Sequence, residues 1–331
     1  MELGYAFTYV RASAINRFEL IFHLMKSLLE AIRPTTFIES AKLRDHLSLD
    51  ITIASETFQH TGSFKFRAAY NLALNVKQDS ILTASSGNFG QALAYACKLL
   101  GKKCTVVMPV TSAQVKIDAV RGYGATVDLI DTTKVGRSER VAQLAEQMPD
   151  AYFASAYDDL LVIEGNSSLG GELAVEDFDA VISPVGGGGL ISGIITGLRR
   201  RAQPTVVYGA EPLLGNDAAR SLREGRIVKN EAEPMTIADG ARTISLGNLN
   251  FPIIQDGVAE IIEVSEERIA DAVRLFFSLA NLKCEPTGAL SLGAILEQPA
   301  KFSRQKICLI VSGGNVDPAV YSRIVNGDSA I

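Results

Sequence analysis

The sequence is poor in the side chains that most often carry acid–base chemistry or bind metals. Among 331 residues there are only three histidines and no tryptophan. The four cysteines form no C-x-x-C pair, and no Cys/His group has the spacing of a zinc site. We therefore expect reduced, mostly buried thiols and a reaction that runs largely without imidazole as acid or base.

Strong positive charge and long apolar runs are also missing. The net charge of −5 gives no global positive field, so we expect no nucleic-acid partner. The N-terminus lacks a basic start followed by an apolar core and a small-residue cleavage site, which makes it a poor signal peptide. No uncharged apolar run approaches the ~20 residues that span a bilayer, so we expect no membrane partner and a cytoplasmic protein.

What the chain does have is the composition of a globular protein and a regular alternation of elements. Hydrophobic residues make up 47% and charged residues 21%, and the length suggests about two domains. Short apolar runs alternate with helical segments, which predicts an α/β fold with mostly parallel sheets covered by helices. The predicted strands are 80–84, 105–109, 126–130, 180–184, 206–210, 261–264 and 307–311. The predicted helices are 13–32, 67–74, 91–100, 112–121, 138–147 and 190–201, with two more helical stretches between the last two strands. No Pro/Ser-rich tether is present, so any two domains should be interwoven.

Lys65 is the first candidate for chemistry. It ends the run T-G-S-F-K at 61–65, just before a predicted helix. A lysine at a helix start faces the positive end of the helix dipole, which lowers its pKa and suits a nucleophilic amine. The alternative is a solvated lysine near a helix start.

Glycine is plentiful, with 28 residues, and it clusters in loops that follow strands. The loop 85–88 (S-S-G-N) leads into a helix, where small hydroxyls and backbone N–H groups form a seat for a carboxylate or phosphate. The loop 186–189 has four glycines and fits a cup for a single phosphate, although it matches neither G-x-G-x-x-G nor a Walker loop. A third loop, 312–315 (S-G-G-N), follows the last strand. An ordinary N-cap and structural glycine turns are the alternatives.

The segment 211–217 places two carboxylates close together with a flexible carbonyl between them. These are hard oxygen ligands, which suit Mg²⁺ or Ca²⁺. Taken alone, the segment is better explained by a solvated acidic loop.

Five motifs together resemble a known family. They are T-G-S-F-K at 61–65, S-S-G-N at 85–88, G-G-G-G-L at 186–190, I-A-D-G at 237–240 and S-G-G-N at 312–315. From about residue 33 to residue 325 the chain resembles the pyridoxal-phosphate enzymes of the tryptophan-synthase-β fold type, nearest to the serine/threonine dehydratase and serine racemase group. The resemblance implies a homodimer of chains with two interwoven three-layer αβα domains. It also implies pyridoxal phosphate in the cleft between a large domain (1–78 and 155–331) and a small one (79–154).

The resemblance also implies roles for individual residues. Lys65 would form the internal aldimine and move the Cα proton, and Ser86 would be the second acid/base of the racemases. Residues implied to hold the cofactor are Phe64, Asn88, Gly186, Gly187, Gly188, Gly189, Leu190, Gly240 and Ser312. Those implied to face the substrate carboxylate are Ser85, Ser86, Gly87 and Phe89, the last where relatives usually carry histidine. The divalent metal would be bound by Glu211, the Gly215 carbonyl and Asp217.

The expected activity is β-elimination from a β-hydroxy amino acid such as L-serine or L-threonine. A neutral serine opposite the pyridine nitrogen, the place implied for Ser312, cannot hold that nitrogen protonated as an aspartate would. Loss of a β-leaving group is then favoured over transamination, and the products are a 2-oxo acid and ammonia. Racemase activity could accompany it through Ser86. The alternatives are a β-replacement synthase of the cysteine or 2,3-diaminopropionate type, although the T-S-G-N-T loop of those enzymes is absent, and a non-catalytic protein that binds pyridoxal phosphate.

Overall fold

The computed structural model describes residues 28–85, 87–112 and 114–327. Most of the predicted helix 13–32 therefore lies outside the described residues, as does Ser86, although 28–31 are helical. Within the described residues, no helix is long and apolar enough to cross a membrane.

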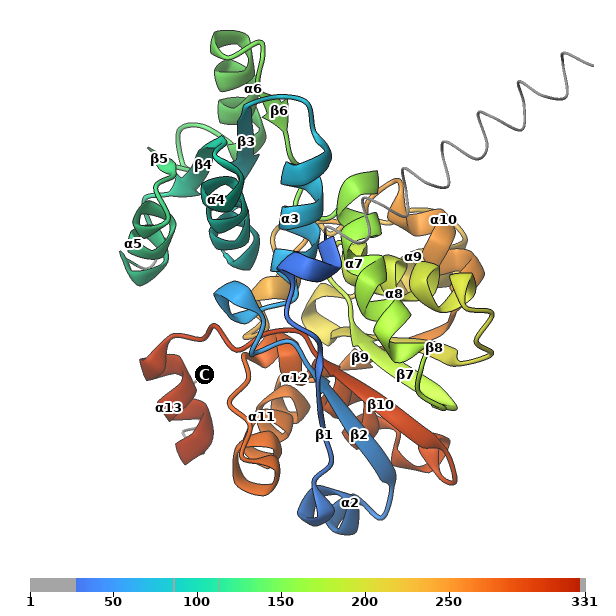
Figure 1. The fold of residues 1–331 in the computed structure, drawn as a ribbon. Helices are drawn as coiled ribbons and strands as arrows, with labels where there is room; N and C mark the ends of the chain where they lie inside the picture. Colours follow the sequence, from blue (N-terminus) through green and yellow to red (C-terminus); the bar gives the residue numbers. More distant parts are fainter. Residues whose placement is uncertain (1–27, 86, 113, 328–331) are drawn as a thin grey trace, which may run out of the picture.

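Two separate sheets form the framework (Figure 1). The larger has the order β1-β2-β10-β7-β8-β9, and all its neighbours are parallel except β1 and β2. The smaller has the order β5-β4-β3-β6 and is parallel throughout. The strands of the larger sheet are β1 (Thr36–Ile38), β2 (Asp50–Ser55), β7 (Ala180–Pro184), β8 (Val206–Pro212), β9 (Val258–Val264) and β10 (Lys306–Val311). Those of the smaller are β3 (Ser80–Ala84), β4 (Lys103–Pro109), β5 (Thr126–Ile130) and β6 (Tyr152–Phe153). The predicted α/β fold with mostly parallel sheets is confirmed, whereas the domain boundaries stay a prediction.

Helices cover both faces of each sheet, because successive strand residues point to opposite faces. In the smaller sheet, Ile81 and Val106 pack with one group of helices, while Leu82 and Val107 pack with α6. The helices are α2 (Ala41–Leu47), α3 (Lys65–Asn75), α4 (Asn88–Leu100), α5 (Gln114–Gly122), α6 (Arg137–Gln147), α7 (Leu160–Leu173), α8 (Gly189–Arg200), α9 (Asp217–Glu224), α10 (Asn250–Gly257), α11 (Glu266–Ala280), α12 (Pro286–Glu297) and α13 (Pro318–Asn326).

Helix α7 was not predicted, and the reason is its composition. It contains three glycines and two serines, which are poor helix formers. The glycines are needed for close packing. A Cβ on Gly165 would lie 2.5 Å from the backbone oxygen of Arg67 in α3, and one on Gly170 would lie 2.4 Å from that of Ile194 in α8. Helix α7 is thus clamped between α3, which begins at Lys65, and α8, which begins at the glycine-rich loop.

Candidate active site

The T-G-S-F-K and S-G-G-N loops lie side by side at the end of β10. Ser63 and Gly313 form an isolated antiparallel bridge, and the Phe64 N–H donates to the Ser312 carbonyl over 3.0 Å. Because β2 and β10 are parallel neighbours, their carboxyl ends deliver both loops to the same edge of the sheet. Phe64, Lys65 and Ser312 therefore lie in adjoining loops.

Lys65 is the first residue of α3, and its side chain lies among apolar groups. Its Nζ donates to the Ala156 carbonyl over 2.8 Å and lies 4.9 Å from the Phe64 ring centre and 5.7 Å from that of Phe89. Burial lowers the pKa of Lys65 to about 8, against the opposing attraction of Glu285. The lowered pKa agrees with the prediction, but burial, rather than the helix start, is its largest cause. An amine with such a pKa is available as a nucleophile near neutral pH.

The four glycines at 186–189 form a cradle that admits no side chain. A Cβ on Gly187 would lie 2.3 Å from the Tyr157 ring, and Gly188 has φ +91° with Ile254 only 2.7 Å from its would-be Cβ. Helix α8 begins at Gly189 without any side-chain cap. Its first N–H groups, including that of Leu190, are therefore open to an anion, which the helix dipole also attracts. The cradle fits a phosphate group.

The residues expected to surround the cofactor ring include a buried hydroxyl and a glycine. Ser312 is buried, and among the described residues its hydroxyl has no hydrogen-bond partner. Gly240 lies against Gly186, whose would-be Cβ is 3.2 Å from the Gly240 oxygen, and is held by a 2.9 Å bond from its N–H to the Thr287 hydroxyl. Asn88 begins α4 and directs its amide toward Glu285. An orphaned buried hydroxyl, an amine and a phosphate cradle together fit pyridoxal phosphate.

The predicted carboxylate seat is the start of α4, with Ser86 outside the described residues. The Ser85 hydroxyl accepts from the N–H groups of Gly87 and Gly90, so it caps the helix. Phe89 is 1% exposed and packs within the apolar core beside the smaller sheet. Its ring therefore forms an apolar wall near the Lys65 amine, where a histidine would bring a polar group.

The acidic segment 211–217 is more enclosed than a solvated loop would be. Glu211 and Asp217 are buried, and the Glu211 oxygens accept from the N–H groups of Ala218 and Ala219 at the start of α9. One Asp217 oxygen accepts from Asn230, while the other is buried with no partner among the described residues. Burial raises the pKa of both carboxyls, that of Asp217 to about 6. No cluster of three or more His, Cys, Asp or Glu side chains suited to a metal occurs in the part of the chain that the structure describes.

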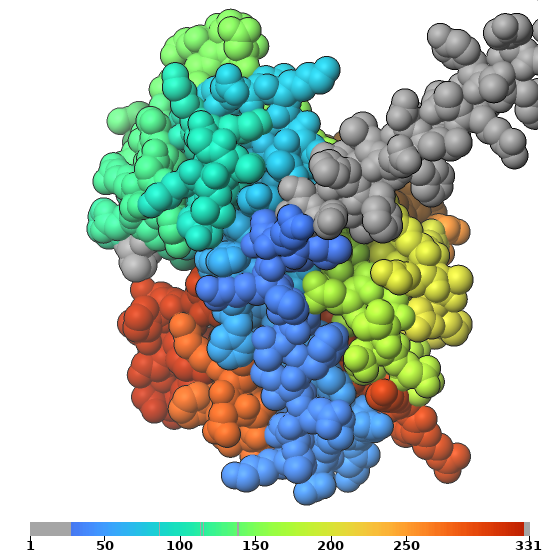
Figure 2. Space-filling view, viewed as in Figure 1, coloured from blue at the N-terminus to red at the C-terminus, as the bar shows by residue number. Residues whose placement is uncertain are grey.

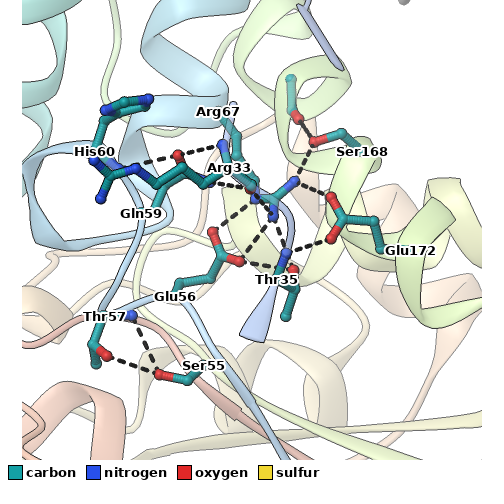
Figure 3. Close-up of polar contacts among 11 residues, drawn as sticks. Arg33, Thr35, Ser55, Glu56, Thr57, Gln59, His60, Arg67, Ser168 and Glu172 are labelled. Carbon is teal, nitrogen blue, oxygen red and sulfur yellow. Dashed lines mark hydrogen bonds and ion pairs between the residues drawn. The ribbon is translucent and has the colours of Figure 1, made fainter. Parts of the chain in front are cut away.

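A buried network around Arg67 fixes the helix that begins with Lys65 (Figure 3). The guanidinium group is fully buried and forms ion pairs at 2.7 Å with Glu56 and with Glu172 of α7. It also donates to the Thr35 hydroxyl over 2.9 Å and to Ser168 over 3.1 Å. Burial acts to lower the pKa of Arg67, but the two carboxylates outweigh it and raise the pKa. In Figure 2 the blue part of the chain runs down the middle of the view, below the cyan-to-green part.

Several residues of the site were not singled out from the sequence. They are Tyr157 and Asn250, which border the glycine cradle, Thr287, which supports Gly240, and Glu285 and Asn315, which hold Asn88. The only available signal was C-E-P-T-G at 284–288, a polar start to an otherwise apolar helix. Asn315 is part of the S-G-G-N motif, but no role was given to it.

Comparisons with known proteins agree on one family. The family model for pyridoxal-phosphate dependent enzymes matches residues 28–313. Serine racemase of Dictyostelium discoideum is 38% identical, with 91% of this chain and 95% of that protein covered. L-threo-3-hydroxyaspartate ammonia-lyase of a Pseudomonas species is 36% identical over 88% of this chain and 93% of that protein. The crystal structure of a T.th. threonine deaminase superimposes with a TM-score of 0.83 at 39% identity, covering 90% of this chain and 97% of that one.

Proposed function

Because this chain belongs to the family of pyridoxal-phosphate dependent enzymes, we propose that it eliminates water from a β-hydroxy amino acid, giving a 2-oxo acid and ammonia. The observation that carries the proposal is the juxtaposition of the Lys65 amine, the glycine cradle and the unpartnered Ser312 hydroxyl. The names of similar proteins, serine racemase, hydroxyaspartate ammonia-lyase and threonine ammonia-lyase, support this class of reaction.

The residues present fit the cofactor and divide its binding among them. The cradle at 186–189 and the Leu190 N–H would hold the phosphate, Asn88 the phenolic oxygen, Ser312 the pyridine nitrogen, and Phe64 and Gly240 the faces of the ring. When bound, pyridoxal phosphate supplies the electron sink that allows the Cα–H bond of an amino acid to break. Every other task falls to the protein.

Lys65 would move the proton. Its Nζ lies in a partly buried, apolar setting, and its pKa of about 8 allows it both to accept and to return a proton near neutral pH. The Phe64 and Phe89 rings limit water near Nζ, which favours proton transfer over exchange with solvent. The Asn88 and Phe89 N–H groups at the start of α4, which Ser85 does not cap, would bind the substrate carboxylate and so aim Cα at Nζ.

Ser312 supports elimination over transamination. A hydroxyl has an ordinary pKa too high to hold a ring nitrogen protonated, so the electron sink is weaker than it would be opposite a carboxylate. In elimination, the β-hydroxyl would leave as the Cα proton is lost. Less negative charge would then have to be held on the ring than in transamination. We also propose racemisation as a side activity through Ser86.

We propose a divalent cation, Mg²⁺ or Ca²⁺, at Glu211, the Gly215 carbonyl and Asp217. The unpartnered, buried Asp217 oxygen supports this role, because a buried anionic oxygen without a donor is costly. Each Glu211 oxygen already accepts a hydrogen bond, one from the Ala218 N–H and one from the Ala219 N–H. These hydrogen bonds compete with binding of the cation. The proposed homodimer rests on the resemblance alone, and light scattering of the purified protein tests it.

Lys65→Ala tests the proposed function. Removal of the amine should abolish both the visible absorbance of the bound cofactor and turnover of a β-hydroxy amino acid. Lys98→Ala, at an exposed lysine near the end of α4, is the matched control and should retain both. Turnover in the Lys65→Ala protein would refute the role of Lys65.

A further inference from the structure

Glu285 is a buried carboxyl group that the proposed reaction does not use. It is 3% exposed, and its two oxygens lie 2.9 and 3.0 Å from Nδ2 of Asn88. The opposite end of that amide, Oδ1, accepts from Asn315 over 2.8 Å, and Asn315 in turn donates to the Thr61 carbonyl. Because the two distances are nearly equal, one hydrogen of the Asn88 amide group is shared between the two Glu285 oxygens. The second amide hydrogen is then free for another acceptor.

Close packing fixes this carboxyl group in place. A Cβ on Gly313 would lie 2.7 Å from a Glu285 oxygen, so the glycine of the S-G-G-N loop makes room for it. The Glu285 N–H donates to the Gly313 carbonyl over 3.1 Å, and α12 begins at the next residue. Two residues further on, Thr287 supports Gly240. The start of α12 thus supports Asn88 and Gly240, two of the residues that would surround the cofactor ring.

Charged groups on several elements act on Glu285. Burial and, to a smaller extent, the negative charge of Asp239 raise its pKa to about 7, against the opposing effects of Asn88, Lys116 of α5 and the Asn315 N–H. Lys116 and Asp239 are themselves paired at 2.9 Å. The neighbouring Cys284 thiol stays protonated, because burial and Glu285 raise its pKa.

Lys65 is the cation that responds to Glu285. Among the groups acting on Lys65, burial lowers its pKa and the attraction of Glu285 raises it. The fold places the two groups near each other: Glu285 contacts Asn88, and the ring of the next residue, Phe89, lies 5.7 Å from the Lys65 amine. Loss of the Glu285 charge should therefore make Lys65 easier to deprotonate.

We propose that Glu285 is a positioning residue with two separable roles: its oxygens orient the Asn88 amide toward the cofactor, and its charge retains the proton on Lys65 before the cofactor binds. This inference rests on the proposed function, because Lys65 must carry the cofactor and Asn88 must face it. The first role depends on a hydrogen bond and the second on a charge, so different substitutions remove them.

The test measures how fast the cofactor-free protein takes up pyridoxal phosphate as a function of pH, followed by visible absorbance. Glu285→Gln keeps an acceptor oxygen for Asn88 but removes the charge. Its pH midpoint for loading should fall by about one unit relative to the unsubstituted protein. Glu285→Asp keeps the charge but is one methylene shorter. Its midpoint should stay unchanged, while the dissociation constant for pyridoxal phosphate rises about 10-fold, as expected for a lost charge-assisted hydrogen bond.

Glu267→Gln is the matched control, because this exposed residue in the first turn of α11 also loses a carboxylate charge. It should load with the midpoint and affinity of the unsubstituted protein. An unchanged midpoint in Glu285→Gln or an unchanged affinity in Glu285→Asp overturns the inference.

Two further arms keep the test decisive. If Glu285→Gln does not fold, Glu285→Asp is combined with Asn88→Ala: an affinity no weaker than in Asn88→Ala alone supports orientation through Asn88, and a further loss of affinity contradicts it. If the unsubstituted protein takes up no pyridoxal phosphate, the proposed function fails. If it does, but the Glu285 variants behave like it, only the inference about Glu285 fails.

Discussion

At the scale of single residues, burial decides the behaviour of the two most important cations, in opposite ways. Lys65 lies among aromatic rings, and burial lowers its pKa to about 8 against the attraction of Glu285. Arg67, two residues later, is buried with two carboxylates at 2.7 Å and stays charged. The same helix turn thus holds a reactive amine and a permanent structural cation. What separates them is the number of close anionic partners.

Lys65 should make the stability of the cofactor-free protein depend on pH. Its pKa falls from 10.5 unfolded to about 8 folded, so between these values the unfolded chain binds more protons and stability rises with pH. The full penalty of about 3 kcal/mol is present below pH 8. We expect Lys65→Met to stabilise the cofactor-free protein most at neutral pH, with the gain shrinking as the pH rises from about 8, in urea unfolding. The exposed Lys98→Met should show no such trend, and a constant gain for Lys65→Met would contradict this explanation.

Arg67→Met should destabilise the protein by about 3 to 5 kcal/mol, because it leaves Glu56 and Glu172 buried or partly buried without their cation. The control is Arg200→Met, which breaks the more exposed pair with Glu164 and should cost about 1 kcal/mol or less. Urea unfolding of both variants is the measurement. Equal losses in the two variants would show that the buried network has no special weight.

At the scale of elements, the strands and the loops that follow them could be predicted because their signals are local. The predicted strands 80–84, 126–130 and 180–184 are confirmed as β3, β5 and β7. The loop at 186–189 could be singled out because four glycines in a row are costly in chain entropy unless bare backbone is needed there. In contrast, α7 gave a weak local signal, and β2 was not predicted although residues 51–53 (I-T-I) are β-branched. Helix α7 is stabilised by contacts with α3 and α8, which depend on residues distant in the sequence.

The site was predictable in the same uneven way. Motif residues such as Lys65 and Ser312 are brought together, since parallel strands deliver their loops to one edge. Glu285 could not be assigned, because its contact with Asn88 joins residues 197 positions apart. The placement of Phe89 in the apolar core likewise depends on how α4 packs against the smaller sheet.

The glycine cradle can be tested against an equivalent glycine elsewhere. Gly188→Ala should weaken binding of pyridoxal phosphate by more than ~10-fold, because φ is +91° and the added Cβ would meet Ile254 at 2.7 Å. Gly225→Ala, at the end of α9, has a similar φ of +67°, but its added Cβ would meet only the Gln255 side chain at an ordinary 3.6 Å. It should lose stability of about 1 kcal/mol and keep its cofactor affinity. Equilibrium titration followed by visible absorbance distinguishes the two, and equal affinities would argue against the cradle.

At the scale of the whole molecule, pyridoxal phosphate and a divalent cation should each stabilise the folded protein, because a ligand that binds only the folded state raises its stability. At the proposed site, pyridoxal phosphate would bridge the loops that follow β2, β7 and β10 and the start of α4, so its binding should raise the melting temperature. The gain should grow with ligand concentration.

Mg²⁺ or Ca²⁺ should also raise the melting temperature, and EDTA should reverse the effect, if the cation binds at Asp217. Asp217→Asn should remove the response, whereas Asp177→Asn, at an exposed carboxylate, should preserve it. A thermal scan with each cation measures this, and a response that survives in Asp217→Asn would place the cation elsewhere.

The central claim is that the assembled loops catalyse elimination from a β-hydroxy amino acid. The most direct measurement incubates the protein, loaded with pyridoxal phosphate, with L-serine, L-threonine and L-threo-3-hydroxyaspartate separately, and quantifies 2-oxo acid and ammonia. We predict equal amounts of 2-oxo acid and ammonia from at least one of these substrates. From O-acetylserine supplied with a thiol, we predict no β-replacement product. A fully loaded protein that forms no 2-oxo acid from any of the three would contradict the account.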